Sequence, residues 1–294
     1  MFRGVYTVLV TPFNSAGEVD YEGLQKNVEW QIQEGIHGLV VNGSTGEFAS
    51  LEDYEREKSM VTVLDAVAGR VPVIVGVSAE ATEKAIYYAK SAKKMGAQGV
   101  LVLPSYYCKP SQEEIFHHFA SIADAIDIPI MIYNNPFTTG VDIQPETVKR
   151  MVDYHPNLGY IKECTGDIKR FRHIQLLCGD KIKVFCGWED LAFESFVMGA
   201  YGWISVIGNV TPKLAVELFE KVAEQKDFDG GWKIYKSMLP LLQFLEYKGK
   251  APQTVKYCLD RMGFSGGNAR MPRLPLSDED KKDIDEILKG LELA

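Results

Sequence analysis

The sequence lacks paired cysteines and any excess of basic residues. Its 294 residues contain only five cysteines, an odd number that is scattered along the chain and never spaced as C-x-x-C. This pattern argues against a disulfide framework and against a zinc site, so we expect reduced thiols in a cytoplasmic protein. The formal net charge of −8 gives no general electrostatic reason to bind polyanions, and nucleic acid is not an expected partner.

Long apolar runs are also absent. No stretch reaches the length of a membrane-spanning helix, so no membrane association is expected. The opening residues, MFRGVYTVLVTPF, place one arginine before a short β-branched run, which is more typical of a first strand than of a signal sequence. With 46% hydrophobic and 24% charged residues, the composition is that of a soluble globular protein.

Eight short β-branched runs alternate with segments of helical periodicity. The runs lie at residues 6–12, 37–43, 71–77, 99–104, 128–134, 159–165, 183–187 and 201–209. Strands that alternate with helices indicate right-handed βαβ units and a parallel sheet. Because the runs are continuously apolar, both faces of each strand should be buried. Eight such units favour an α/β fold of the closed (β/α)₈ or TIM-barrel type over an open doubly wound sheet.

After the eighth run the pattern is helical only. Apolar residues recur at helical spacing from TPKLAVELFEKVAEQ to SDEDKKDIDEILKGLEL, with no further strand between them. We therefore expect a catalytic (β/α)₈ barrel over residues 1–210 and a C-terminal helical region over residues 211–294. In such a barrel, the chemistry is located at the carboxyl ends of the strands.

The stretch GYIKECTGD, residues 159–167, places a lysine in a strand that should otherwise be apolar. If Ile161 packs outward against helices, Lys162 points into the barrel near its catalytic end. Burial disfavours the ammonium form, so we expect a lowered pKa and a nucleophilic amine suited to Schiff-base chemistry on a ketone. The alternative for an ordinary strand lysine is to snorkel to solvent or to pair with a carboxylate such as Glu163.

Polar residues follow several other strands. The motif NGSTGEF places Ser44 and Thr45 on a glycine-containing loop whose amides could converge on an anion. Tyr107 follows the fourth run, and Tyr133 ends the fifth. Taken singly, each of these features is at least as consistent with a turn or with packing as with function. Together with an inward lysine, they form a set of proton donors and acceptors around one pocket.

These motifs resemble those of the dihydrodipicolinate synthase and N-acetylneuraminate lyase family, which forms Schiff bases with pyruvate and related 2-oxo acids. The resemblance covers nearly the whole chain, through VTPF, GSTGE, YYCKPSQE, IMIYNNP, IKECTGD and ISVIGN. It implies a (β/α)₈ barrel with a C-terminal helical extension, a class I lyase activity and a homotetramer. It also implies that neither a metal nor an organic cofactor is needed. Consistently, none of the five histidines falls at the carboxyl end of an expected strand, where a metal-dependent aldolase would need ligands.

The resemblance implies a role for each matching catalytic residue. Lys162 would form the imine with a 2-oxo acid, and Tyr133 would be the general acid and base beside it. Ser44 would belong to the proton relay and, with Thr45, would hold the carboxylate of the 2-oxo acid. Tyr107 would reach into the site of a neighbouring subunit.

Three further positions concern the wall of the pocket. Gly187 and Ile204 match positions that line it near the lysine. Thr138 stands where dihydrodipicolinate synthases resemble N-x-P-x-R-T-G, with an arginine that binds a carboxylate, whereas this chain reads NNPFTTG. Exchanging an arginine for a hydroxyl removes charge-assisted hydrogen bonds of about 1.5–3 kcal/mol.

Three functions therefore stay open. The hydroxyl at Thr138 favours a lyase that cleaves or dehydrates a 2-keto-3-deoxy sugar acid or a related 2-oxo acid. The first alternative is 4-hydroxy-tetrahydrodipicolinate (dihydrodipicolinate) synthase, which condenses pyruvate with aspartate semialdehyde in lysine biosynthesis. The second is a non-catalytic sensor of 2-oxo acids, against which the intact set Lys162, Tyr133 and Tyr107 argues. The GWED loop, residues 187–190, could suit a polyhydroxylated substrate, although acids at a solvated helix N-terminus are the simpler interpretation.

Overall fold

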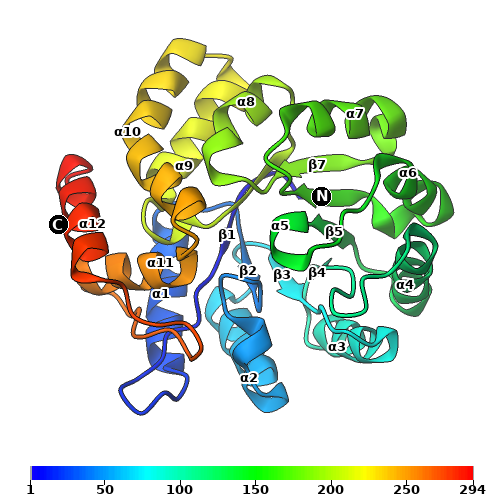
Figure 1. Cartoon of the computed structure of the whole chain (residues 1–294), viewed down its shortest axis with the longest axis horizontal. Helices are drawn as coiled ribbons and strands as arrows, with labels where there is room; N and C mark the ends of the chain where they lie inside the picture. The colour runs from blue at the N-terminus through cyan, green and yellow to red at the C-terminus, as the bar shows by residue number, and fades with distance from the viewer. Residues whose placement is uncertain (1, 294) are drawn as a thin grey trace.

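The computed structural model describes residues 2–293 as a closed parallel barrel wrapped by helices (Figure 1). The eight strands follow one another around the barrel in sequence order, and β8 pairs with β1 to close it. The predicted (β/α)₈ fold with additional C-terminal helices is therefore confirmed. Between residues 2 and 293, no helix combines the length and the apolar character needed to cross a membrane.

The strands are short, and each overlaps one of the eight predicted runs. They are β1 Gly4–Val8, β2 Gly38–Val41, β3 Val73–Gly76, β4 Gly99–Val102, β5 Ile130–Asn134, β6 Tyr160–Glu163, β7 Lys183–Cys186 and β8 Gly202–Ser205. Nearly every strand residue is buried, because one face of the sheet packs on helices and the other fills the barrel.

Helices follow the strands as βα units require. They are α1 Tyr21–Gln33, α2 Asp53–Val67, α3 Thr82–Lys94, α4 Gln112–Ala125, α6 Pro145–Tyr154, α7 Ile168–Cys178, α8 Ala192–Val197 and α9 Pro212–Phe219. The short helix α5, Pro136–Thr139, lies in the loop between β5 and α6. Single 3₁₀ turns occupy Phe48–Ser50, Pro156–Leu158, Gly179–Lys181, Glu189–Leu191 and Ile207–Asn209, and a π-helical turn, Glu220–Gln225, extends α9.

Polar caps account for the start of two barrel helices. Ser111 precedes α4, where its hydroxyl accepts the Glu114 N–H and the Glu114 carboxylate accepts the Ser111 N–H, a reciprocal capping box. Asp20 precedes α1 and accepts the Gly23 N–H at 2.9 Å. Each cap satisfies backbone donors that the helix leaves without an internal partner.

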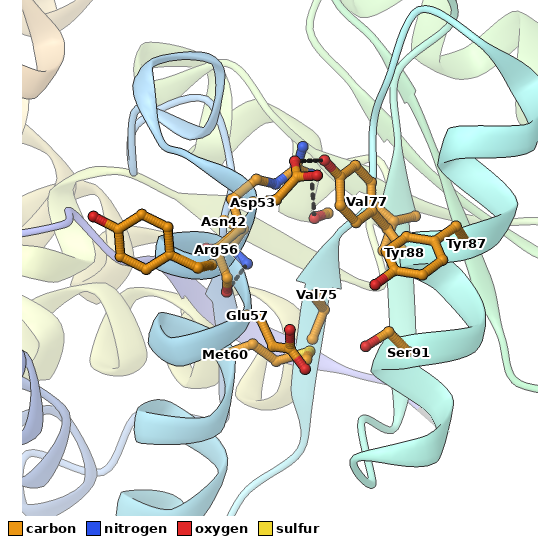
Figure 2. Close-up of a pocket in the computed structure, with 12 residues that line it drawn as sticks. Asn42, Asp53, Arg56, Glu57, Met60, Val75, Val77, Tyr87, Tyr88 and Ser91 are labelled. Atoms are coloured by element: carbon orange, nitrogen blue, oxygen red, sulfur yellow. Dashed lines mark hydrogen bonds between the residues drawn. The ribbon is translucent and has the colours of Figure 1, made fainter.

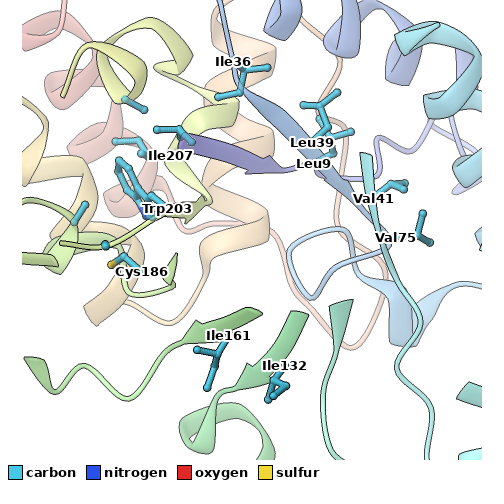
Figure 3. Packing of buried hydrophobic residues seen from close by; sticks show 14 of the residues in the cluster. Leu9, Ile36, Leu39, Val41, Val75, Ile132, Ile161, Cys186, Trp203 and Ile207 are labelled. Atoms are coloured by element: carbon cyan, nitrogen blue, oxygen red, sulfur yellow. The ribbon is translucent and has the colours of Figure 1, made fainter. Parts of the chain in front are cut away.

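The alternation of side chains along the strands divides the core in two. One set packs between the sheet and the helices and includes Ile132, Ile161 and Trp203 (Figure 3). The other set fills the barrel interior and includes Phe185. Because Ile161 belongs to the outer set, the next residue along β6, Lys162, points into the barrel.

The C-terminal extension consists of α10 Phe228–Tyr247, α11 Ala251–Arg261 and α12 Asp278–Gly290, drawn from yellow to red in Figure 1. The helix before it, α9, directly follows β8 and packs against β1, which is the position of an eighth barrel helix. Helix α10 packs against α9 and against the Glu189–Leu191 turn, so the extension reaches the carboxyl end of β7. The division of the chain after residue 210 stays a prediction.

A buried ion pair connects this extension to the barrel. Lys256 Nζ, on α11, lies 2.5 Å from Glu47 Oε1 in the loop after β2, and the two side chains are 1% and 0% exposed. The other carboxylate oxygen of Glu47 accepts the Arg270 N–H at 3.0 Å, and the Arg270 guanidinium donates two hydrogen bonds of 2.6 Å to Glu55 on α2. Burial lowers the pKa of Lys256 to about 8, although Glu47 opposes the shift.

Replacing Lys256 with methionine should lower the free energy of unfolding by about 3–5 kcal/mol, because Glu47 would remain buried without its counter-ion. Urea unfolding measures the change. Arg261→Met is the matched control, since Arg261 pairs with Asp285 at the partly exposed surface, where a pair contributes about 1 kcal/mol or less. Equal losses in the two variants would contradict a structural role for the buried pair.

Candidate active site

Lys162 and Tyr133 meet at the carboxyl end of the barrel. They are directly paired in register on β6 and β5, and they are 3% and 4% exposed. Lys162 Nζ lies 4.3 Å from the centroid of the Tyr133 ring. The arrangement places a buried amine, a nucleophile once it is deprotonated, beside a phenol that can give or take a proton.

The predicted lowering of the Lys162 pKa is wrong for this arrangement. Burial does lower the pKa of Lys162, but the neighbouring Tyr133 and Cys164 outweigh burial and leave the pKa above its ordinary value. Burial raises the pKa of Tyr133 as well, although the charge of Lys162 opposes that shift. At neutral pH the pair is therefore an ammonium beside a phenol. One proton has to leave the ammonium before the amine can attack, and until then the positive charge attracts an anionic substrate.

Among residues 2–293, the neighbours of Lys162 leave its ammonium group without an ion pair and leave space for its side chain. Glu163 does not pair with it, because the Glu163 carboxylate accepts N–H groups of Asn134 and Thr165 at 3.2 and 2.8 Å. Gly187, which follows β7, leaves room for the lysine: a Cβ added there would lie 2.7 and 2.9 Å from Lys162 Cγ and Cε. A side chain at position 187 would thus displace the lysine.

Asn135 connects Tyr133 to the loop that follows β5. Its Nδ2 donates to the Tyr133 phenol oxygen at 3.0 Å, and its Oδ1 accepts the Thr138 N–H at 3.2 Å at the start of α5. The phenol oxygen therefore accepts one hydrogen bond from the protein and keeps its own proton for another partner. No sequence pattern pointed to Asn135, although it stands two residues after Tyr133.

A cavity of about 420 Å³ opens above Lys162. Its walls come from the loops after β2, β5, β6, β7 and β8 and from α10, α11 and the segment between α11 and α12. It brings together six of the residues predicted for the site, namely Ser44, Thr45, Tyr133, Thr138, Lys162 and Gly187. The roles assigned to them from the resemblance stay predictions.

Two predicted site residues lie elsewhere. Ile204, on β8, is fully buried in the barrel interior and does not form part of the cavity wall, which Val206 lines instead. Tyr107, on the loop after β4, is 88% exposed, and its N–H donates to Glu80 at 3.1 Å. Within this chain Tyr107 does not reach the cavity. Its predicted role in a neighbouring subunit's site stays a prediction.

Two carboxyl groups that sequence reasoning did not assign also line the cavity. Glu189 is 2% exposed, so the interpretation of the GWED loop as a solvated helix N-terminus is wrong. Its carboxylate accepts the Val206 and Ile207 N–H groups at 2.8 Å, and its own N–H donates to Glu246 at 2.6 Å. Burial raises the pKa of Glu189 to about 7 and that of Glu246 to about 8. Residues 2–293 contain no group of three or more His, Cys, Asp or Glu placed to hold a metal ion.

The cavity wall also includes an arginine that no motif singled out. Arg273, between α11 and α12, lines the cavity together with Thr138. A smaller adjoining cavity of about 160 Å³ shares Ser44, Thr138 and Arg273 with it. Only the folded chain reveals this neighbour, because Arg273 comes from the C-terminal extension, far along the sequence from the barrel motifs.

A further cavity lies on the outer side of the barrel, between α2 and α3 (Figure 2). Arg56 is buried there, with its guanidinium carbon 3.9 Å from the centre of the Tyr88 ring, and it donates to the Gly76 carbonyl at 3.2 Å. Tyr88 in turn donates to Asp53. These contacts hold the two helices to the sheet, and Lys162 is not part of this cavity.

The sequence profile described as "Dihydrodipicolinate synthetase family" matches residues 1–291. The chain belongs to this family. It is an enzyme of the lyase class, in line with the predicted activity class.

Relatives of this family member are similar over their whole length. The 4-hydroxy-tetrahydrodipicolinate synthase of Geobacter metallireducens is 40% identical over 296 residues, which cover 100% of both chains. That of Bartonella bacilliformis is 38% identical over 291 residues, or 98% of each chain. The crystal structure of dihydrodipicolinate synthase from Thermotoga maritima matches with a TM-score of 0.96 and 36% identity, again over 100% of both chains.

Raising the pH from about 5 to 8 should destabilise this enzyme through Glu246. Its pKa of about 8 in the folded chain exceeds the ordinary 4.5, so the folded state binds the proton more tightly. The resulting stability is complete below the ordinary value and is lost as the pH rises to the folded value, at up to about 1.4 kcal/mol per pH unit. Glu246→Gln keeps an oxygen acceptor for the Glu189 N–H but cannot titrate, so its stability should fall less.

Urea unfolding of both proteins across this pH range measures the difference. Glu286→Gln, at an exposed position of α12, is the control for the loss of one carboxylate. Parallel curves for the wild type and Glu246→Gln would contradict the assigned titration.

Proposed function

We propose that the enzyme is a 4-hydroxy-tetrahydrodipicolinate synthase that condenses pyruvate with aspartate semialdehyde through an imine on Lys162. The observation that carries this proposal is the in-register pair of Lys162 and Tyr133 beneath a cavity, in a chain whose relatives are named as that synthase. The proposal reverses the order of the sequence-based hypotheses, which favoured a sugar acid.

The groups around Lys162 suit each step of imine formation. The pyruvate carboxylate binds at Ser44 and Thr45, and its ketone carbon faces Lys162 Nζ. After the ammonium has lost one proton to water, the amine adds to that carbon, and the carbonyl oxygen leaves as water with one proton from the nitrogen and one from Tyr133. The result is a protonated imine, with Tyr133 as the phenolate.

Carbon–carbon bond formation then uses the same groups. The Tyr133 phenolate takes a proton from C3 of the imine, and the electron pair of that C–H bond moves toward the imine nitrogen to give an enamine. The enamine carbon attacks the aldehyde carbon of the second substrate, which restores the protonated imine, and the aldehyde oxygen takes the proton that Tyr133 removed from C3. The amino group of the bound semialdehyde finally adds to the imine carbon and releases Lys162 as the free amine while the ring closes.

The sugar-acid hypothesis is the second candidate. Asn135 and Thr138 place neutral groups in the cavity wall, and hydrogen bonds of about 0.5–1.5 kcal/mol each could hold the hydroxyls of a 2-keto-3-deoxy sugar acid. The objection to the synthase was the lack of a cation at Thr138, and Arg273 beside it weakens that objection. The sensor hypothesis is not retained, since the chain is a lyase.

We further infer that the enzyme acts in the cytoplasm as a homotetramer. All five cysteines are free, which suits a reducing compartment. The exposure of Tyr107 suits a side chain that a partner subunit covers. One solved relative, at 35% identity and a TM-score of 0.94, is described as a monomeric dihydrodipicolinate synthase variant.

Borohydride reduction with pyruvate should add one covalent adduct per chain, on Lys162, because this buried amine lies beside a phenol that can transfer a proton. Intact-mass analysis and peptide mapping locate the adduct. Lys162→Met should give none, whereas Lys183→Met, which alters a lysine at the opposite end of the neighbouring strand, should react like the wild type. An adduct on another lysine, or none with any 2-oxo acid, contradicts the mechanism.

Steady-state kinetics separate the two candidate reactions. The wild type should condense pyruvate with aspartate semialdehyde with a kcat/KM at least about tenfold above that for cleaving or dehydrating 2-keto-3-deoxy sugar acids, as expected when a cation in the site pairs with a substrate carboxylate. The reverse ratio would establish the sugar-acid reaction instead.

A further inference from the structure

We infer that Arg273 binds the carboxylate of the second substrate, so that the C-terminal extension supplies the cation that the barrel lacks at Thr138. This inference rests on the proposed synthase function and names the residue that would select its second substrate. It starts from the position of Arg273, which lines the Lys162 cavity and the adjoining smaller cavity. Thr138 lines both cavities too, so the two residues share one region of the wall.

The hydrogen-bond donors of Arg273 are uncommitted. Within residues 2–293, its one ion-pair contact joins Nη1 to Glu47 Oε2 at 3.7 Å, which is too long for a hydrogen bond. By contrast, the guanidinium of Arg270, three residues earlier, donates to Glu55, Ser50 and Gly17. A guanidinium carries five donors in a planar fork that matches a carboxylate. Arg273 therefore has the donors for such a group and no protein acceptor that takes them.

The charged side chains around Arg273 include one more cation than carboxylates. Glu47 and Glu55 are the carboxylates of this cluster, and Lys256, Arg270 and Arg273 are its cations. Lys256 Nζ donates to one carboxylate oxygen of Glu47 at 2.5 Å, and the backbone N–H of Arg270 donates to the other at 3.0 Å. Arg270 itself pairs with Glu55 at 2.6 Å. Two anions against three cations leave one positive charge, and Arg273 is the cation without a close partner.

The exposure of the Arg273 side chain, rather than its place on a wall that it shares with Ser44, suits the second substrate. Lys162 is 3% exposed at the buried end of the cavity, whereas the Arg273 side chain is 35% exposed at its wall. The 2-oxo acid has to present its ketone to Lys162, and its carboxylate is proposed to bind at Ser44 and Thr45 in the same cavity. A substrate that brings an aldehyde to the enamine would direct the carboxylate at its other end along the cavity that Arg273 lines.

The segment that carries Arg273 is held firmly enough to act as a fixed anchor. Arg270 ties it to Glu47 through its N–H and to α2 through Glu55. The Gly17 carbonyl, in the loop before α1, accepts two further N–H groups of Arg270, at 3.3 and 2.9 Å. The Arg273 N–H donates to the Arg270 carbonyl at 3.1 Å. The backbone that carries Arg273 is thereby fixed, which reduces the entropy lost when the side chain binds a ligand.

Kinetics of Arg273→Gln test the inference. The KM for aspartate semialdehyde should rise about ten- to hundredfold, the loss expected for a charge-assisted contact, while the KM for pyruvate and the yield of borohydride adduct change less than about threefold. Arg273→Lys should fall between, because a single ammonium replaces the fork. Arg150→Gln, which removes a surface arginine paired with Glu113, is the matched control and should leave both KM values unchanged.

A second-site variant distinguishes the loss of a carboxylate contact from a general loss of folding. Thr138→Arg places a guanidinium on the same wall, so Arg273→Gln/Thr138→Arg should recover at least about tenfold in KM for aspartate semialdehyde relative to Arg273→Gln. An unchanged KM in Arg273→Gln, or equal rises for both substrates without rescue, overturns the role of Arg273 and leaves the synthase proposal intact. A wild type that consumes no aspartate semialdehyde overturns the proposed function, and this inference with it.

Discussion

The site depends on the burial of one ammonium group inside the barrel. A buried charge is costly unless its surroundings compensate it, and Lys162 has no carboxylate as a direct partner, since Glu163 bonds elsewhere. What compensates it is the Tyr133 ring at 4.3 Å, held by register between β5 and β6 and by the Asn135 amide. Gly187 leaves the space the lysine needs. Partners that stabilise the cation without neutralising it keep the amine available to a substrate.

The same reasoning extends to the charge of the whole cavity. Lys162 and Arg273 contribute two cations, while burial raises the pKa of Glu189 to about 7 and that of Glu246 to about 8. Near neutral pH these carboxyl groups are therefore largely or partly protonated, and the cavity is positive in a chain whose net charge is −8. Such a local field favours two anionic substrates over neutral ones. The burial of Glu189 and Glu246, which favours their neutral forms, and the presence of Arg273 in the wall both make the cavity more positive.

The features that the sequence predicted are those set by local periodicity. A period of two along β6 places Lys162 inside once Ile161 is outside, and the common direction of the parallel strands places Tyr133 and the strand-end loops at one end of the barrel. The period does not determine how far along the barrel axis a side chain lies. Ile204, which was predicted to line the pocket, therefore points inward but does not reach the cavity. The pKa of Lys162 depends on neighbours from other strands, and the contribution of Arg273 depends on how the extension folds back. Neither has a local signature in the sequence.

The loop after β2 connects the two proposed substrate positions. Ser44 and Thr45, the predicted carriers of the pyruvate carboxylate, stand two or three residues before Glu47, whose backbone is left-handed at φ 58°. Glu47 turns its carboxylate away from the barrel to Lys256 and to the segment that carries Arg273. A shift of the extension would therefore be transmitted through this buried carboxylate to the loop that carries Ser44 and Thr45. The extension thus contacts the loop proposed for the first substrate and carries the arginine proposed for the second, which gives a physical reason for three more helices after the barrel.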